Sequence, residues 1–502
     1  MAYFPLKIED AVVAMTNLEA SRRRTAIDSW KPMGRAEFRA YVGLLILAGV
    51  YRSRGETCES LWDAESGRSV FRATMPLKTF RAYSSALRFD DRETREARRR
   101  NDRGQYDKLA PVRAVWDEWC LSCTDRDPRS PWTRDWCHLE VCVMMMMTMM
   151  MMERMGWILG RCPFRQYMPS KPARYRIKIW VACDAWSSYA WKMQVYAGKP
   201  DKLGPPEKNL AARVVMDLTE GLAPRRNVTC NNFFTSRKLA TWLFRERGHT
   251  LLGTLRANRL EIPRELRCVK GRAVGSAEAA VLHGGPDGWS PDTVVLSYVA
   301  KKNKNVLLLT TSPRYVGPSG SLLEPSSNPD GGGPAKPSMV LHYNRTKGGV
   351  DNLDKVVGTY SCRRKTSRWP VALFHNMVDV AAYNAFVLWR EIHPDWVSGK
   401  LNKRRLFLER TRGGSREGEG EAVSAPDSRR DEPRETPVKR QRCRVCPRSK
   451  DIKTKIVCST CHVHVCSRCA LTYCPNCAAA RRPVSRRDPS DDDERRGPPV
   501  SA

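Results

Sequence analysis

The chain has 502 residues, too many for one ordinary domain, so we expect two to four folded units. It carries 87 Lys and Arg against 54 Asp and Glu, a formal net charge of +33, and such an excess attracts polyanions, above all nucleic acid. A membrane partner is not expected, since we find no lipidation signal, no long basic amphipathic helix and no apolar run of transmembrane length. The first ten residues lack the layout of a secretory signal, which predicts an intracellular protein.

The first 135 residues are predicted to be helical, because apolar residues recur there at three- and four-residue spacing. Cys120 and Cys123 have metal-ligand spacing, but no second pair follows at a suitable distance, so we expect buried thiols. The methionine-rich tract at 141–157 is too short and too weakly apolar to span a bilayer. A methionine-rich binding face is conceivable, but we interpret the tract as a repeat-derived insertion or a translation artefact without function.

From residue 176 the pattern changes to strands. We expect the strand RIKIWVACD with the hairpin partner YAWKMQVYAG, the helix AARVVMDLTEGL, the strand RNVTCNNFF, a helix that ends at Gly248, and the strand TLLGTLR. Residues 258–337 are predicted to be an insertion that contains the hairpin TVVLSYVAKKNKNVLLLTT and a loop rich in Gly, Pro and Ser. Residues 361–412 are predicted to be helical. The charged segments 413–442 and 478–502 are predicted to be a disordered linker and tail.

Three carboxylates are placed where they could hold a divalent ion. Asp184 lies where an apolar strand ends, while Asp351 and Asp354 are three residues apart and share one face of a predicted helix. The alternative is that Asp351 is an acid at a helix start, which the helix dipole stabilises.

Three sequence blocks, GRCPFRQYMPSKPARYRIKIWVACD, RNVTCNNFFTSRKLA and YNRTKGGVDNLDKVVGTYSCRRKTSRWPVALFHNM, resemble the signature blocks of the piggyBac transposase family, in the same order. The resemblance implies an α/β chain with an RNase H-like core at 176–257 and 338–360. It also implies a helical dimerisation and DNA-binding region at 1–175, and a homodimer on double-stranded DNA. In such a core, acids hold two Mg²⁺ ions that act on a phosphodiester. By motif, Asp184 matches the first family aspartate, and Asp351 and Asp354 match the last pair.

Asn231 departs from the family pattern, because the resemblance places an aspartate at this position. An amide offers one neutral oxygen and cannot bridge two cations, so we expect weak or absent binding of the second Mg²⁺ and strongly reduced strand cleavage. Asp217 is interpreted as an exposed helix acid and not as a replacement ligand. The methionine tract replaces the usual family segment upstream of Gly160, which together with Asn231 indicates a decayed or repurposed transposase.

The block YSCRRKTSRWP combines basic side chains, which neutralise phosphates, with an indole that can stack on a base. By resemblance, the predicted DNA contacts are Arg363, Arg364, Lys365, Arg368 and Trp369. The alternative is a solvated basic helix face with a core tryptophan.

Four CxxC pairs between residues 443 and 477 are the most specific pattern in the chain. Eight thiolates give two closed Cys₄ sites for two structural Zn²⁺ ions, and metal binding must supply the folding energy of so short a segment. The short gaps favour a cross-braced module, as in RING and PHD domains, and His462 and His464 are interpreted as surface residues. The predicted ligands are Cys443, Cys446, Cys458, Cys461, Cys466, Cys469, Cys474 and Cys477.

Basic runs at 402–405 and 439–442 are candidate nuclear-import signals, so we expect a nuclear protein. Three functions remain open. The first is a DNA-binding transposase relative with an incomplete metal site and weak or no strand cleavage. The second is an active transposase that cuts and joins at TTAA sites. The third is a chromatin or protein adaptor that uses the zinc module.

Overall fold

The computed structural model divides the chain into two units, Met1–Arg416 and Glu417–Ala502. It describes residues 4–23, 30–101, 107–124, 141–148, 162–169, 175–198, 207–284, 291–315, 336–410, 441–442 and 453–454. In the second unit the described residues form an antiparallel pair, β10 (Gln441–Arg442) with β11 (Lys453–Thr454). The eight predicted zinc ligands, most of the linker and the tail lie outside the described residues.

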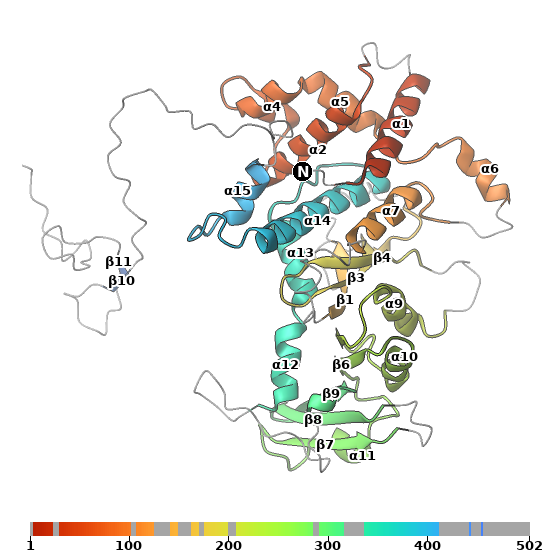
Figure 1. Cartoon of the computed structure of the whole chain (residues 1–502), viewed down its shortest axis with the longest axis vertical. Coiled ribbons are helices and arrows are strands. Elements are labelled where there is room, and N and C mark those ends of the chain that lie inside the picture. The colour runs from red at the N-terminus through yellow and green to blue at the C-terminus, as the bar shows by residue number, and fades with distance from the viewer. Residues whose placement is uncertain are drawn as a thin grey trace, which may run out of the picture. The chain divides into compact units, whose positions relative to one another are not determined.

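The first unit begins with helices (Figure 1). They are α1 (Leu6–Arg22), α2 (Arg35–Val50), α3 (Cys58–Trp62), α4 (Ser69–Thr74), α5 (Leu77–Ala86), α6 (Thr94–Asn101) and α7 (Arg113–Thr124). All of these helices except α6 pack apolar residues with α14 (Trp369–Ile392) into one large hydrophobic core. Helix α15 (Lys403–Arg410) adds Phe407 and Leu408 to the same core.

Helix α14 is 24 residues long and apolar enough to cross a bilayer by length and composition, which differs from our expectation that the chain has no such run. However, 89% of its most apolar window is buried inside the protein. A helix that is hydrophobic all round is buried, either in a membrane or in the core of a large domain. Here the N-terminal helices, α13 and the sheet supply that core (Figure 1).

A mixed nine-stranded sheet follows, in the order β2-β3-β1-β5-β6-β9-β8-β7, with β4 paired to β3. Strand β1 is antiparallel to β3 but parallel to β5, which is parallel to β6. The strands are β1 (Val141–Thr148), β2 (Gln166–Tyr167), β3 (Tyr175–Asp184), β4 (Ala190–Val195), β5 (Asn227–Cys230), β6 (Thr250–Thr254), β7 (Ala277–Leu282), β8 (Thr293–Lys301) and β9 (Lys304–Thr310).

Helices cover both faces of the sheet, and the alternation of side chains along β3 shows which face each residue serves. Ile177, Ile179, Val181 and Cys183 join the core that contains α14, whereas Trp180 and Ala182 join a second core. That second core contains α9 (Leu210–Leu218) and α10 (Arg237–Arg247). Ser236 caps the start of α10 by accepting a hydrogen bond from the Leu239 N–H, and Gly248 ends it with φ +61°, as the sequence predicts.

The methionine tract contributes a central strand, which the sequence analysis did not expect. Residues 141–148 pair with β3 over their whole length, from Val141 opposite Asp184 to Thr148 opposite Ile177, and with β5 at 141–143. The first half of the tract is therefore part of the fold.

The predicted insertion continues the same sheet. Strand β9 pairs with β6 and β8 pairs with β9, so the predicted hairpin lies beside the core strands. Helix α12 (Ser338–Thr346) packs on this part of the sheet through a third, smaller core. The short α11 (Arg264–Arg267) and a 3₁₀ turn (Pro313–Tyr315) complete this part of the chain.

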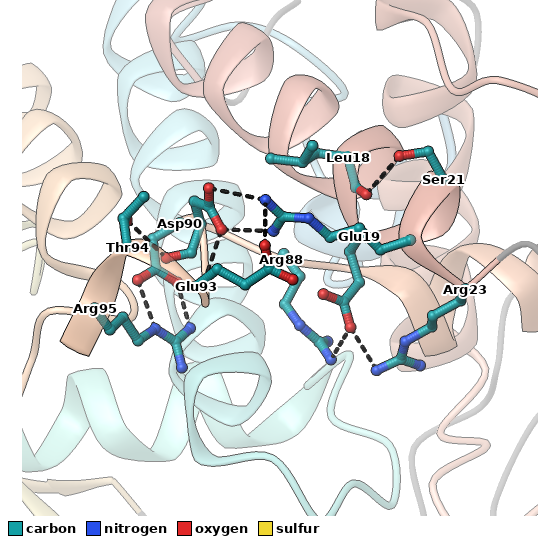
Figure 2. A network of polar contacts seen from close by, with 11 residues as sticks. Leu18, Glu19, Ser21, Arg23, Arg88, Asp90, Glu93, Thr94 and Arg95 are labelled. Carbon is teal, nitrogen blue, oxygen red and sulfur yellow. Dashed lines mark hydrogen bonds and ion pairs between the residues drawn. The ribbon is translucent and has the colours of Figure 1, made fainter. Parts of the chain in front are cut away.

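A buried carboxylate joins α1 to the segment that follows α5. Glu19 is only 4% exposed, and its side chain accepts ion-pair contacts from Arg88 at 2.8 Å and Arg23 at 2.6 Å (Figure 2). Arg88 also donates its backbone N–H to the Thr16 hydroxyl. Because a buried carboxylate without partners is costly, these contacts fix the position of α1.

Gly49 in α2 lies against the main chain that follows α13 (Gly349–Thr359). A Cβ at Gly49 would approach the Tyr360 carbonyl oxygen to 2.4 Å, whereas a Cβ at Gly43, in the same helix, meets nothing within 4 Å. We expect Gly49→Ala to lower the free energy of unfolding by about 1–3 kcal/mol through overpacking. Gly43→Ala is the matched control and should be neutral or stabilising by up to about 1 kcal/mol. Urea unfolding followed by circular dichroism measures the free energy of unfolding of both variants. Equal changes in the two variants would contradict the close contact between Gly49 and the Tyr360 carbonyl.

His375 in α14 makes stability depend on pH. Burial, together with the nearby Arg363, Arg364 and Arg368, lowers the pKa of His375 to about 3. The unfolded chain binds a proton below about pH 6.5 that the folded chain excludes. The contribution of neutral His375 to the free energy of unfolding is therefore fully present above pH 6.5. It falls as the pH decreases toward 3, by at most about 1.4 kcal/mol per pH unit. We expect His375→Leu to flatten urea-unfolding stability between pH 6.5 and 4. A matched change at the exposed His283 should leave the slope unaltered, and an unchanged slope in His375→Leu would contradict the assignment.

Candidate functional site

Asp184 ends β3 and is only 7% exposed. Its carboxylate accepts hydrogen bonds from the Ser187 N–H at 2.6 Å and from the Ser187 hydroxyl, and its backbone N–H donates to the Tyr189 carbonyl at 2.9 Å. These contacts close a tight turn between β3 and β4. The observed contacts of the Asp184 side chain thus belong to a turn that shapes the end of the strand.

Asn231 follows β5 directly, and its amide is also used locally. The side-chain oxygen accepts the Phe233 N–H at 3.0 Å, and the backbone oxygen accepts from the N–H groups of Phe234 and Thr235. This is an Asx turn, which bends the chain at the end of the strand toward α10. An aspartate could form the same turn, so the local fold does not require the amide.

The strand register does not bring Asp184 and Asn231 together. Asp184 pairs with Val141, and Val141 pairs with Val228, which comes three residues before Asn231. Three residues along a strand span about 10 Å, and crossing from β3 to β5 adds about 10 Å sideways. Two ligand oxygens on one Mg²⁺ lie only about 4 Å apart, so these two residues cannot share one ion in this arrangement.

Register instead places a methionine beside Asn231. Val143 of β1 pairs with Cys230 of β5, so the next position on β1, Met144, comes level with Asn231. The residues from Val143 to Thr148 include no carboxylate. A second acid near Asn231 would therefore have to come from outside the two central strands.

Helix α13 brings its acids to the sheet through a close backbone contact at Gly349. A Cβ there would lie 3.1 Å from Ala185 Cα, Cys142 Cβ and Cys183 Sγ, so a larger residue would push the helix start and its neighbours in β1 and β3 apart by a few tenths of an ångström. Asn352 Nδ2 donates to the Ser188 hydroxyl at 2.9 Å, and the hydroxyls of Thr346 and Thr229 meet at 2.9 Å. The start of α13 is thereby held across β5, β1 and the turn after Asp184.

The two acids of α13 differ in their surroundings. Asp351 is exposed in the first turn, and Asp354 is half-buried and acts electrostatically on Arg363. In the described part of the chain, no three His, Cys, Asp or Glu side chains gather closely enough to hold a metal ion. The donor set does not fit the two-ion site that the resemblance implies, since Asp184 and Asn231 bond to their own turns and lie far apart.

The basic block after α13 is an extended segment rather than the expected helix, and two of its arginines point into the protein. Arg364 donates to the carbonyl oxygens of Ser53 at 3.3 Å and Glu56 at 2.7 Å. Arg368 donates to the carbonyl oxygens of Leu87 at 2.7 Å and Ser84. Burial lowers the pKa of Arg368 to about 10. These guanidinium groups join the segment to the loops that follow α2 and α5.

Arg363, Lys365 and Trp369, the other predicted DNA contacts in the block, have different environments. Arg363 lies 3.9 Å from the Asp379 carboxylate. Trp369 is buried and meets the Phe164 ring edge-on, with the ring centroids 5.0 Å apart. Lys365 is exposed. Of these three, only Lys365 presents its side chain to solvent, and DNA contact by the block stays a prediction.

Asp379 is an organising residue that the sequence analysis missed. Its carboxylate, buried in α14, accepts from the Ser361 hydroxyl at 2.6 Å and from the Cys362 N–H at 2.7 Å. Burial raises its pKa, although Arg363 acts in the opposite direction. The available signal was a carboxylate within a long apolar helix, because such a group is retained only with partners.

Comparisons with known proteins identify the family. A family model described as Transposase IS4 matches residues 1–126 and 140–386. The human PiggyBac transposable element-derived protein 3 is 25% identical over 223 residues, which are 42% of this chain and 35% of that protein. The human Chimeric ERCC6-PGBD3 protein is also 25% identical over 223 residues, 42% of this chain and 19% of that protein. The chain thus aligns with about a third or less of the length of these curated relatives.

A solved structure matches nearly the whole chain. The cryo-EM structure of a piggyBac transposase synaptic complex with hairpin DNA superposes with a TM-score of 0.66, at 27% identity, over 95% of both chains. It shares the mixed α/β fold described above. Since the family model covers most of the chain and the matched structure covers nearly all of it, the chain belongs to the piggyBac-type transposase family.

Proposed function

We propose that this protein binds double-stranded DNA as a piggyBac-type transposase relative whose strand-cleavage site is incomplete. The observation that carries the proposal is the likeness, over 95% of both chains, to a transposase solved with hairpin DNA. The formal charge of +33 agrees with a polyanionic partner. The central strands β3, β1, β5 and β6, with helices on both faces, support the RNase H-like core that the resemblance implies.

A basic surface on the α10 face suits the phosphate backbone. Two neighbouring cavities of about 710 and 400 Å³ share Glu261. They are lined by Asn209, Arg237, Lys238, Thr241, Trp242, Arg245 and Glu246 on one side and by Arg256, Asn258, Arg259 and Leu260 on the other. Cations outnumber carboxylates here, and Trp242 is 37% exposed among them. Lys and Arg side chains such as these bind the phosphates of nucleic acid, and an exposed indole can stack on a base.

The arrangement of possible metal ligands supports the proposal that strand cleavage is impaired. Asp351 and Asp354 remain on α13, but Asn231 provides an amide, and Met144 occupies the neighbouring position on β1. Paired divalent cations need carboxylates that offset their charge, and this part of the sheet lacks them. Two structural Zn²⁺ ions in the cysteine-rich segment, homodimerisation and nuclear localisation stay predictions from the sequence.

The first test concerns DNA. The variant Lys238→Gln/Arg256→Gln/Arg259→Gln should bind a labelled 30-base-pair duplex more weakly. It should also reduce the slope of log K against log salt by about 0.9 for each phosphate that the variant no longer neutralises. Fluorescence anisotropy of the full chain at several salt concentrations measures both. Lys78→Gln, an exposed lysine on α5 outside both cavities, is the control. Wild-type affinity that hardly changes with salt would instead favour the protein-adaptor function.

The second test concerns metal and cleavage. We expect Asn231→Asp alone to leave strand cleavage with Mg²⁺ or Mn²⁺ near background, because no carboxylate lies beside it on β1. The double variant Met144→Asp/Asn231→Asp should tighten Mn²⁺ binding by about tenfold or more, the scale on which changes near a metal alter affinity. Calorimetric titration measures this.

Asn232→Asp/Met144→Asp is the matched control, because Asn232 is the neighbouring exposed amide. Thermal unfolding in EDTA checks that each variant folds. Robust cleavage by the wild-type chain would overturn the proposal of an incomplete site and establish an active transposase.

A further inference from the structure

Arg52 holds a backbone conformation that arginine disfavours. It follows α2 with φ +57°. Its N–H donates to the Gly49 carbonyl, and the Ser53 N–H donates to the Ala48 carbonyl, both at 3.0 Å. This pair of bonds is a Schellman motif, in which the left-handed position is usually glycine. A residue with a Cβ is strained there, so the presence of arginine suggests that its side chain has a role.

The Arg52 side chain lines a cationic cavity of about 420 Å³. Four stretches of chain converge on it, from the end of α2, the residue before α4, the end of α13 and the first turn of α15. The lining residues are Val50, Tyr51, Arg52, Arg68, Tyr360 and Arg405. Three guanidinium groups and two phenol rings thus surround a space wide enough for a tetrahedral oxyanion, and arginine binds such anions with paired N–H donors.

The acids near this cavity do not neutralise it. Arg68 lies 3.5 Å from Glu56 and above the Tyr51 ring, and Arg405 lies 2.8 Å from Glu409. Arg52 instead lies 5.9 Å from the centre of the Tyr360 ring, and no acidic side chain among the described residues pairs with it.

A second arginine lies close to the Tyr360 ring. Arg404 lies 5.1 Å from the centre of the Tyr360 ring. The cavity therefore keeps an excess of positive charge around Arg52.

The loop that carries Arg52 is held in place before any ligand binds. Arg364 bonds to the carbonyl oxygens of Ser53 and Glu56, and Arg54 donates to the Gly358 carbonyl. A binding group on a fixed loop loses little conformational entropy on contact. The half-buried Arg364 of the basic block thus positions an arginine that faces solvent.

We propose that this cavity binds one phosphate of the DNA backbone and that Arg52 is its principal contact. The proposal rests on the DNA binding proposed above and adds a site on the opposite side of the sheet from α10. The competing explanation is that Arg52 only stabilises the C-terminal end of α2, where the helix dipole favours a cation.

The experiment uses Arg52→Gly in the full chain. Glycine removes the strain of the left-handed position, so the melting temperature should rise, while affinity for the labelled duplex should fall several-fold. The slope of log K against log salt should decrease by about 0.9, the value for one phosphate. Glu409→Gln, which removes the acid beside Arg405, should strengthen binding. Phosphate binding by Arg52 thus predicts higher stability and weaker DNA binding in Arg52→Gly. Stabilisation of the end of α2 predicts lower stability and unchanged DNA binding.

Arg225→Gly is the matched control. Arg225 is also left-handed, with φ +63°, and it lies before β5, away from the cavity. Its substitution removes the same charge and the same strain, so it should stabilise the fold and leave DNA binding unchanged.

Each other outcome overturns the proposal. Wild-type affinity and slope in Arg52→Gly would reject the cavity while leaving the DNA-binding function in place. Equal weakening by Arg225→Gly would mean that only net charge matters. A lower melting temperature of Arg52→Gly with unchanged affinity would assign Arg52 to helix capping. Failure of the wild-type chain to bind duplex DNA would reject both proposals together.

Discussion

The buried carboxylate of Asp379 is the contact on which the arrangement of the first unit depends. It lies inside α14, where a charge without partners would be costly, and it is retained because the Ser361 hydroxyl and the Cys362 N–H bond to it. Those bonds fix the chain where α13 ends. The next residues then send Arg364 and Arg368 to carbonyl oxygens after α2 and α5. The buried helix α14 thereby holds the end of α13, and the segment that follows ties α14 to the chain after α2 and α5.

The positive charge of the chain serves two purposes that composition does not distinguish. Some arginines, such as Arg88, Arg364 and Arg368, are internal ties between segments that are distant in sequence. Others, such as Arg52 and Arg256, line surface cavities. The two groups are coupled, because Arg364 holds the loop on which Arg52 lies. A basic block in the sequence can therefore act on a phosphate indirectly, by fixing a neighbouring arginine.

The central strand β1 shows that the fold and a metal site make different demands on the same residues. A strand between two neighbours requires backbone partners on both edges, and β1 has them in β3 and β5. A metal site requires carboxylates at particular positions, which is a much narrower condition. The pairing of β1 with β3 and β5 satisfies the first condition, and the proposal of an incomplete site rests on the second, because neither Met144 nor Asn231 carries a carboxylate.

The sequence by itself determined the local elements: the strands β3, β5 and β6, the helices α9 and α10 with their end at Gly248, and the hairpin of β8 and β9. It did so because hydrophobic periodicity and turn residues act within a few residues of each other. The motif blocks also indicated the family, which the comparisons confirmed.

Only the tertiary structure decided that the methionine tract forms the strand between β3 and β5, that Asp184 and Asn231 lie far apart, and that Arg364 and Arg368 face inward. Strand register and the partner of a guanidinium are set by contacts between residues far apart in sequence. No local pattern encodes them.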